Sequence, residues 1–79
     1  MKKQEHSRIC TAFGIAVRQA RVIRGLSQEK LAEFSDLNRT YIGDIERGKR
    51  NVSLVNMQKI ATALDLKLSD LILSYEERK

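Results

Sequence analysis

The sequence of 79 residues has no proline, no tryptophan, one cysteine and one histidine. A single cysteine cannot form an internal disulfide or a zinc site built from several cysteines, and it fits the reducing cytoplasm. His6 and Cys10 together supply at most two metal ligands, and one histidine leaves no catalytic triad to assemble. The four glycines are scattered, so no phosphate-cradling loop is present. We therefore expect no enzyme activity, no metal and no cofactor.

Long apolar runs are missing as well. No stretch approaches the roughly 18 consecutive apolar residues of a membrane span, and the polar first ten residues do not resemble a signal peptide. We expect a cytoplasmic protein without a membrane partner or a small-molecule ligand. The length allows one compact domain with a modest core, to which a second subunit would add apolar burial.

Charge of one sign predominates, because 15 lysine and arginine residues face 10 acidic ones and give a formal net charge of +5. Such an excess favours a polyanionic partner. A small soluble domain carries a net charge of roughly 2 to 8 without any such partner. The charge therefore needs a motif before it indicates a function.

Apolar residues recur at helical spacing in five stretches, separated by short polar or glycine-bearing segments. The pattern predicts an all-α fold of five helices in a single domain, ordered from about residue 8 to 75 and frayed from Glu76 to Lys79. The first helix is expected from about Arg8 to Arg24, with Gly25 just past its end. Its inward residues are expected to be Ile9, Phe13, Ala16, Val17 and Ala20.

Good N-cap residues mark the start of each of the four helices that follow. Ser27 precedes a helix from Gln28 to about Ser35, Asn38 one from Arg39 to about Arg47, Ser53 a fourth, and Ser69 a fifth from Asp70 to about Tyr75. The expected inward residues are Leu31, Ala32 and Phe34, then Ile42 and Ile45, then Leu54, Met57, Ile60, Ala61 and Leu64.

About three residues join the second and third helices, which is the spacing of a helix-turn-helix. Ala32 keeps the second helix thin where the third crosses it, and Leu37, Ile42 and Ile45 hold the third to the core from one side. The opposite flank is then free to enter a DNA groove. It carries Arg39, Thr40, Gly43 and Asp44, with Tyr41 at its edge.

Gly43 is unusual in a helix interior, where glycine costs about 1 kcal/mol relative to alanine. We interpret it as allowing close approach of the helix backbone to DNA. Close packing of two helices is the alternative explanation.

The motifs Ser27-Gln28-Glu29, Leu31-Ala32, Leu37 and Ile45-Glu46-Arg47-Gly48 resemble the lambda-Cro-repressor type of helix-turn-helix family, also called the XRE family. The runs 38–42 and 45–53 are similar to the controller proteins of bacterial restriction-modification systems. This resemblance implies a lambda-repressor-like five-helix subunit that binds operator DNA as a dimer and regulates its own gene and the endonuclease gene. Asp36 departs from the family, which often has glycine in the turn, but aspartate tolerates positive φ better than most residues.

Base-reading roles fall on the outward flank of the third helix. Arg39 can present its planar fork to guanine O6 and N7, and Thr40 can offer a hydroxyl to a base and a methyl group to thymine. Tyr41 could brace a phosphate or simply pack. Arg50 is added because similar controller proteins use an arginine there, a solvated arginine being the alternative. Asp44 stays open: it could accept from cytosine N4, repel wrong sequences, or orient Arg39 or Arg47.

Phosphate contacts are expected around this helix. Gln28 lies in the first turn of its own helix, where backbone N–H groups favour a phosphate. The other expected contacts are Asn38, Gly43, Arg47, Lys49 and Asn51. The family resemblance also implies a structural ion pair between Arg21 and Glu46.

The fourth and fifth helices carry more apolar residues than one subunit obviously needs, which predicts a two-fold dimer interface unless all of them are core. The candidates are Leu64, Leu66, Leu68, Leu71, Ile72 and Tyr75. Operator DNA and a second copy are the expected partners, with RNA polymerase a further candidate. A phage-type repressor or an antitoxin remains an alternative, and so does a module of another class that sequesters a partner protein.

Overall fold

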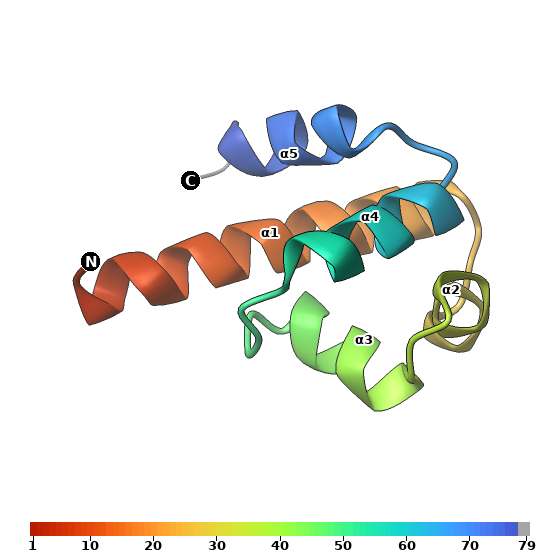
Figure 1. Ribbon diagram of the computed structural model, residues 1–79, viewed down its shortest axis with the longest axis horizontal. Helices are drawn as coiled ribbons and strands as arrows, with labels where there is room; N and C mark the ends of the chain where they lie inside the picture. Colours follow the sequence, from red (N-terminus) through yellow and green to blue (C-terminus); the bar gives the residue numbers. More distant parts are fainter. Residues whose placement is uncertain (78–79) are drawn as a thin grey trace.

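Five α-helices make up most of the computed structural model, which describes residues 1–77. They are α1 (Lys3–Ile23), α2 (Gln28–Ser35), α3 (Arg39–Glu46), α4 (Leu54–Ala63) and α5 (Leu68–Glu76). α1 runs the length of the molecule, with α2 and α3 on one side of it and α5 on the other (Figure 1). The all-α, five-helix prediction is confirmed. No helix within residues 1–77 is both long and apolar enough to cross a membrane.

One cluster of apolar side chains, drawn from all five helices, forms the core. Each such side chain, fully buried, contributes roughly 1.5–3 kcal/mol relative to an exposed one. Because Ile42 and Ile45 of α3 pack into this cluster, the opposite flank of α3 lies at the surface. The largest fully buried side chains are Val17, Leu31, Ile42, Ile45, Ile60, Leu64 and Leu71.

α1 begins at Lys3, five residues earlier than the predicted start at Arg8. The added turns contain good helix formers, and the backbone N–H of His6 donates to the carbonyl of Lys2 at 3.1 Å. Glu5 in the first turn is favourable beside the helix N-terminus. An apolar pattern cannot find such a segment, because its residues are polar on every side.

The predicted N-caps are confirmed at three helices. The side-chain oxygens of Ser27, Asn38 and Ser53 accept from the backbone N–H groups of Lys30, Tyr41 and Asn56 at 2.8–3.2 Å. Ser69 was wrong as a cap, because α5 begins one residue before it, at Leu68, with Lys67 at the N-cap position. The predicted end at Tyr75 differs from the observed one by a single residue, and Arg78 and Lys79 lie outside the described residues.

Two apolar residues expected to point inward do not. Phe34 is 56% exposed, because the inner stripe of α2 is formed by Leu31, Ala32 and Ser35. Ser35 fits there because its hydroxyl donates to the carbonyl of Leu31 at 2.6 Å. Leu54 is 67% exposed at the first turn of α4, one turn before the helix reaches the core.

Two of the residues predicted at the dimer interface are instead buried inside the subunit. Leu64 and Leu71 are each 1% exposed and belong to the core of the subunit, so they offer no surface to a partner. The sequence could not separate core from interface here, since both demand the same residue types. Partial burial against the core is shared by the four other candidates, Leu66, Leu68, Ile72 and Tyr75.

Two backbone features fix how α3 is held. The turn after α2 passes through Asp36 in the left-handed region, with φ 57° and ψ 38°, as its tolerance of positive φ predicted. α1 and the end of α3 meet at Gly14, where an added methyl group would overlap the carbonyl oxygen of Ile45 and lie 2.9 Å from that of Glu46. A side chain at Gly14 would therefore push α3 off α1.

Candidate nucleic-acid interface

α3 presents a polar flank beside the turn that joins it to α2. Ala32 is buried where the two helices pack, and Leu37 is half-buried against the core. Arg39 and Thr40, the first two residues of α3, are both exposed. The free flank predicted for the recognition helix is therefore present at its N-terminal end, where base contacts in a helix-turn-helix begin.

Arg39 is held by a residue that sequence reasoning placed only in the first turn of α2. Its Nε donates to Oε1 of Glu29 at 3.1 Å, and both side chains are exposed. The hydrogen bond from Arg39 lowers the pKa of the Glu29 carboxyl. Glu29 thus steers the guanidinium toward the helix-turn-helix surface, although an exposed pair of this kind adds little stability.

Tyr41 bridges α3 to its surroundings. Its hydroxyl accepts from Nδ2 of Asn56 at 3.1 Å, and the guanidinium of Arg50 lies 5.4 Å from the centre of its ring. Both the ring and the hydroxyl of Tyr41 therefore have partners within the protein, as the packing explanation predicts. Asn56 was not singled out from the sequence, where it looks like one more polar residue in the first turn of α4.

The Asp44 carboxylate forms ion pairs with two arginines. One carboxylate oxygen accepts from Nη2 of Arg47 and the other accepts from Nε of Arg50 at 3.2 Å. Of the roles left open for Asp44, this is the orienting one, although it acts on Arg47 and Arg50 and not on Arg39. The three residues order the cations at the C-terminal end of α3 and in the loop that follows.

Gly43, which was predicted on the free flank, is buried. The side chain of Arg47, drawn toward Asp44, lies over it, and an added methyl group would stand 3.2 Å from Nη1 of Arg47. A side chain at position 43 would therefore have to displace the end of the Arg47 side chain, which is 61% exposed. The close approach of the Gly43 backbone to DNA stays a prediction.

The predicted ion pair between Arg21 and Glu46 is confirmed. Nε and Nη2 of Arg21 donate to the two carboxylate oxygens of Glu46 at 2.7 and 3.0 Å, and Nη1 donates to the carbonyl of Leu26 at 2.8 Å. The hydrogen bond to Glu46 raises the pKa of Arg21. Because the two side chains are only 13% and 4% exposed, the pair anchors the end of α3 to α1 inside the protein.

Gln28 joins this pair. Its Nε2 donates to Oε1 of Glu46 at 3.1 Å, so the first turn of α2 is tied to the last residue of α3. One amide N–H of Gln28 is thereby committed inside the protein. The structure places Asn38, Arg47, Lys49 and Asn51 at the surface around α3, as expected from the sequence.

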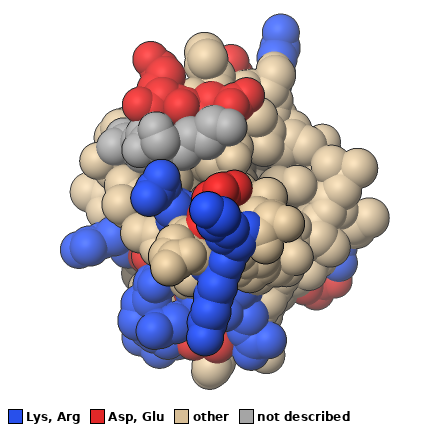
Figure 2. All heavy atoms as spheres, turned by 90° about the vertical axis from the view of Figure 1, so that its left-hand side faces the viewer, with Lys and Arg blue, Asp and Glu red and all other residues tan. Residues whose placement is uncertain are grey.

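The cations form a surface at one end of the molecule. Figure 2 views the end at which α1 begins, and lysine and arginine side chains gather on its lower part, on the side of α3. The exposed cations of α3 and the loop after it are Arg39, Arg47, Lys49 and Arg50. A surface of this kind matches a polyanion in charge.

The family model described as helix-turn-helix matches residues 17–71, which include α2, α3 and α4. The chain belongs to this helix-turn-helix family. It is 57% identical over 61 residues to the control protein C.BamHI of Bacillus amyloliquefaciens, with 76% of this chain and 75% of that protein covered. Both predicted resemblances, to the helix-turn-helix family and to restriction-modification controllers, are confirmed.

Solved structures of controller proteins share the fold of this helix-turn-helix protein. The restriction-modification controller protein C.AhdI from Aeromonas hydrophila matches with a TM-score of 0.77 at 53% identity, covering 78% of this chain and 94% of that one. The controller protein C.Esp1396I matches with a TM-score of 0.82 at 27% identity, covering 89% and 92%. The structures of C.Esp1396I include single substitutions of an arginine, a threonine and a tyrosine at three consecutive positions.

Proposed function

We propose that this helix-turn-helix protein reads a double-stranded DNA operator as a transcriptional regulator, and that it controls the genes of a restriction-modification system, its own and that of the endonuclease. The observation that carries the proposal is the division of α3, in which Ile42 and Ile45 are buried while Arg39 and Thr40 are exposed. The similarity to C.BamHI and C.AhdI supports the controller role.

Base reading is assigned to Arg39, Thr40 and Arg50, with Tyr41 as the support of Arg50. Arg39 begins α3, from where a bidentate fork reaches guanine in the major groove. The Arg-Thr-Tyr order of residues 39–41 matches the order of the residues substituted in the C.Esp1396I structures, which supports these positions. Asp44 sets the geometry of Arg50 from within the protein.

Phosphate binding is assigned to residues around α3 and in the loop that follows it. Each is exposed or retains a donor that the protein does not use, and such contacts position a protein without reading sequence. Gln28 contributes its second amide N–H together with the N-terminus of α2. The remaining members of the set are Asn38, Arg47, Lys49 and Asn51.

Selection of bound duplexes from a random pool tests the proposed function. We expect a single enriched sequence with two-fold symmetry, because two recognition helices one DNA turn apart, roughly 34 Å, would read it. The purified protein is mixed with the pool at moderate salt, and the bound fraction is sequenced after several rounds. A bound pool without any enriched sequence would contradict a role as an operator reader.

Two-fold reading requires a dimer, and an apolar patch supplies a candidate interface. The patch consists of Phe34, Leu54, Val55 and Leu68, which line one groove across α2, α4 and the start of α5. Three of these side chains are more than half exposed, which is unusual for large apolar residues gathered in one place. A second copy is the occupant we propose, because the patch leaves the outer flank of α3 uncovered and Leu68 was among the interface residues expected from the sequence.

Replacing Leu54 with glutamate tests the interface. The change places a charge in the patch, and glutamate is well tolerated at the first turn of a helix. We expect Leu54→Glu to sediment as a monomer at concentrations at which the unmodified protein is a dimer. Ile23→Glu is the matched control, because Ile23 is 81% exposed on α1 outside the patch. Equal dimerisation of both variants would place the interface elsewhere.

The cytoplasm is the proposed location, and RNA polymerase is a proposed second partner. Both follow from the assignment as a bacterial transcriptional regulator of the controller type.

A further inference from the structure

The N-terminal turns of α1 precede the part of the chain that the family model matches. The family model begins at residue 17, whereas α1 begins at Lys3. These turns carry Lys3 and Arg8, which are both exposed. Their position relative to the proposed DNA surface decides whether they take part in binding.

The loop between α3 and α4 closes on this part of α1. Gly48 at the start of the loop packs so tightly on Thr11 that an added methyl group would lie 2.7 Å from its hydroxyl oxygen and 2.9 Å from its Cα. Farther along, Arg50 and Asn51 share a hollow with Ile9 and Cys10. The loop therefore runs alongside the first half of α1 and does not project away from it.

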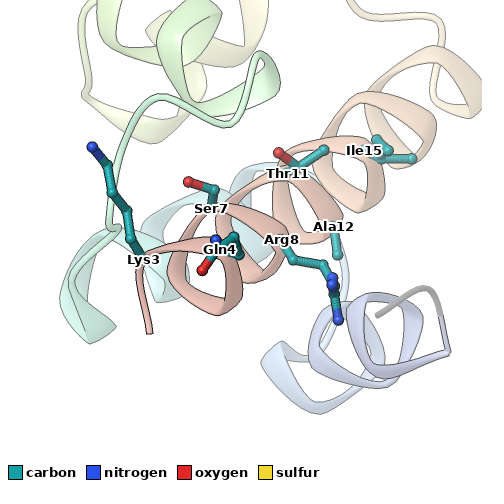
Figure 3. Close-up of a pocket in the computed structure, with 7 residues that line it drawn as sticks. All are labelled: Lys3, Gln4, Ser7, Arg8, Thr11, Ala12 and Ile15. Atoms are coloured by element: carbon teal, nitrogen blue, oxygen red, sulfur yellow. The ribbon is translucent and has the colours of Figure 1, made fainter. Parts of the chain in front are cut away.

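Lys3 and Arg8 leave α1 in opposite directions. Figure 3 shows Lys3, Ser7 and Thr11 on the side of α1 toward α3 and the loop, whereas Arg8 and Ala12 point to the side of α5. Side chains four residues apart stack on one face of a helix, so Thr11 and Ser7 continue to Lys3 over successive turns. Lys3 thus points to the side of α1 on which the loop lies, and this loop carries the exposed cations Lys49 and Arg50.

Nothing in the described part of the protein neutralises Lys3. It takes part in none of the ion pairs within residues 1–77, whereas Arg50 is shared with Asp44. No acidic residue occurs in the loop between α3 and α4. The ammonium group therefore adds an uncompensated charge to the edge of the DNA surface.

We propose that Lys3 extends the DNA-binding surface along α1 and binds a phosphate of the duplex backbone next to those contacted by the loop. The proposal rests on the proposed function. Because a flexible ammonium group contacts a phosphate as a point charge, Lys3 contributes affinity and salt dependence without sequence preference. The extra turns of α1 thereby acquire a role that the matched domain alone does not have.

Lys3→Gln and Arg8→Gln are a matched pair that tests this contact. Both remove one positive charge from the same helix, but only Lys3 is on the side of the loop. Binding to the selected operator is measured from 50 to 200 mM salt. We expect Lys3→Gln to reduce the slope of log affinity against log salt by about 0.9, so that the loss of affinity over this range becomes about threefold smaller. Arg8→Gln keeps the slope of the unmodified protein.

Equal changes in the two variants would show that only net charge matters, and no change in either would show that Lys3 is not at the DNA. Both results overturn the proposal. The ratio of operator to random-duplex affinity is measured in parallel and is expected to stay the same in both variants. Failure of the proposed function itself would be recognised separately, as an absence of sequence preference in the unmodified protein.

Discussion

Replacing Arg21 with methionine is expected to lower the free energy of unfolding by about 3 to 5 kcal/mol, the usual cost of breaking a buried ion pair from one side. Glu46 would keep its carboxylate inside the protein with Gln28 as the remaining side-chain donor, and the carbonyl of Leu26 would lose a donor. Small domains have only about 5 to 15 kcal/mol of stability in total. Urea unfolding followed by circular dichroism measures the change.

Two comparisons make this result specific to the pair. Arg24→Met removes an exposed arginine whose Nη1 is 3.7 Å from Oδ2 of Asp65, and it should cost at most about 1 kcal/mol. Replacing both Arg21 and Glu46 with methionine should recover most of the loss, because no unpaired buried charge is left. If Arg21→Met were as stable as Arg24→Met, the ion pair would not be what holds α3 to α1.

Arg39→Ala is expected to abolish discrimination at one base pair of each half-site. A bidentate contact to guanine is worth about 1–3 kcal/mol of discrimination, so the preference there should fall by roughly 5- to 150-fold. The fold should be unaffected, since the side chain is exposed and its only side-chain partner within the described residues is the exposed Glu29. Affinity is measured over a panel of operators with one base pair changed at a time.

Lys49→Ala is the control for Arg39→Ala. Lys49 lies in the loop, where we assign it to a phosphate, so its loss should weaken binding to every duplex in the panel by a similar factor. If Arg39→Ala gave the same uniform loss, Arg39 would be a backbone contact and the reading role would pass to Thr40 and Arg50.

Local signals in the sequence were sufficient for the fold. Caps at Ser27, Asn38 and Ser53, and the apolar spacing of α3, depend on neighbouring residues and were therefore predictable. The errors arose where a residue type serves two purposes. Leucine at position 64 suits a core and an interface equally. The polar segment before Arg8 forms a helix but has no apolar stripe from which the helix could be predicted.

The candidate site was predicted less completely, because its organisation depends on contacts between elements. The positions of Arg39 and Thr40 followed from the spacing of Ile42 and Ile45. The partners Glu29 and Asn56 did not, since a carboxylate in α2 and an amide in α4 reach α3 only once the chain has folded. The burial of Gly43 was missed for the same reason, because the covering side chain of Arg47 depends on Asp44.

The direct backbone contacts at Gly14 and Gly48 have a consequence for how the duplex is bound. Because α1 and the end of α3 meet closely at Gly14, and the Arg21–Glu46 ion pair ties them together, the proposed recognition helix would enter a groove as a rigid unit. Any mismatch in groove width or local twist must then be absorbed by the nucleic acid. Flexible pyrimidine–purine steps outside the touched bases would consequently favour tight complexes, through the mechanics of DNA itself.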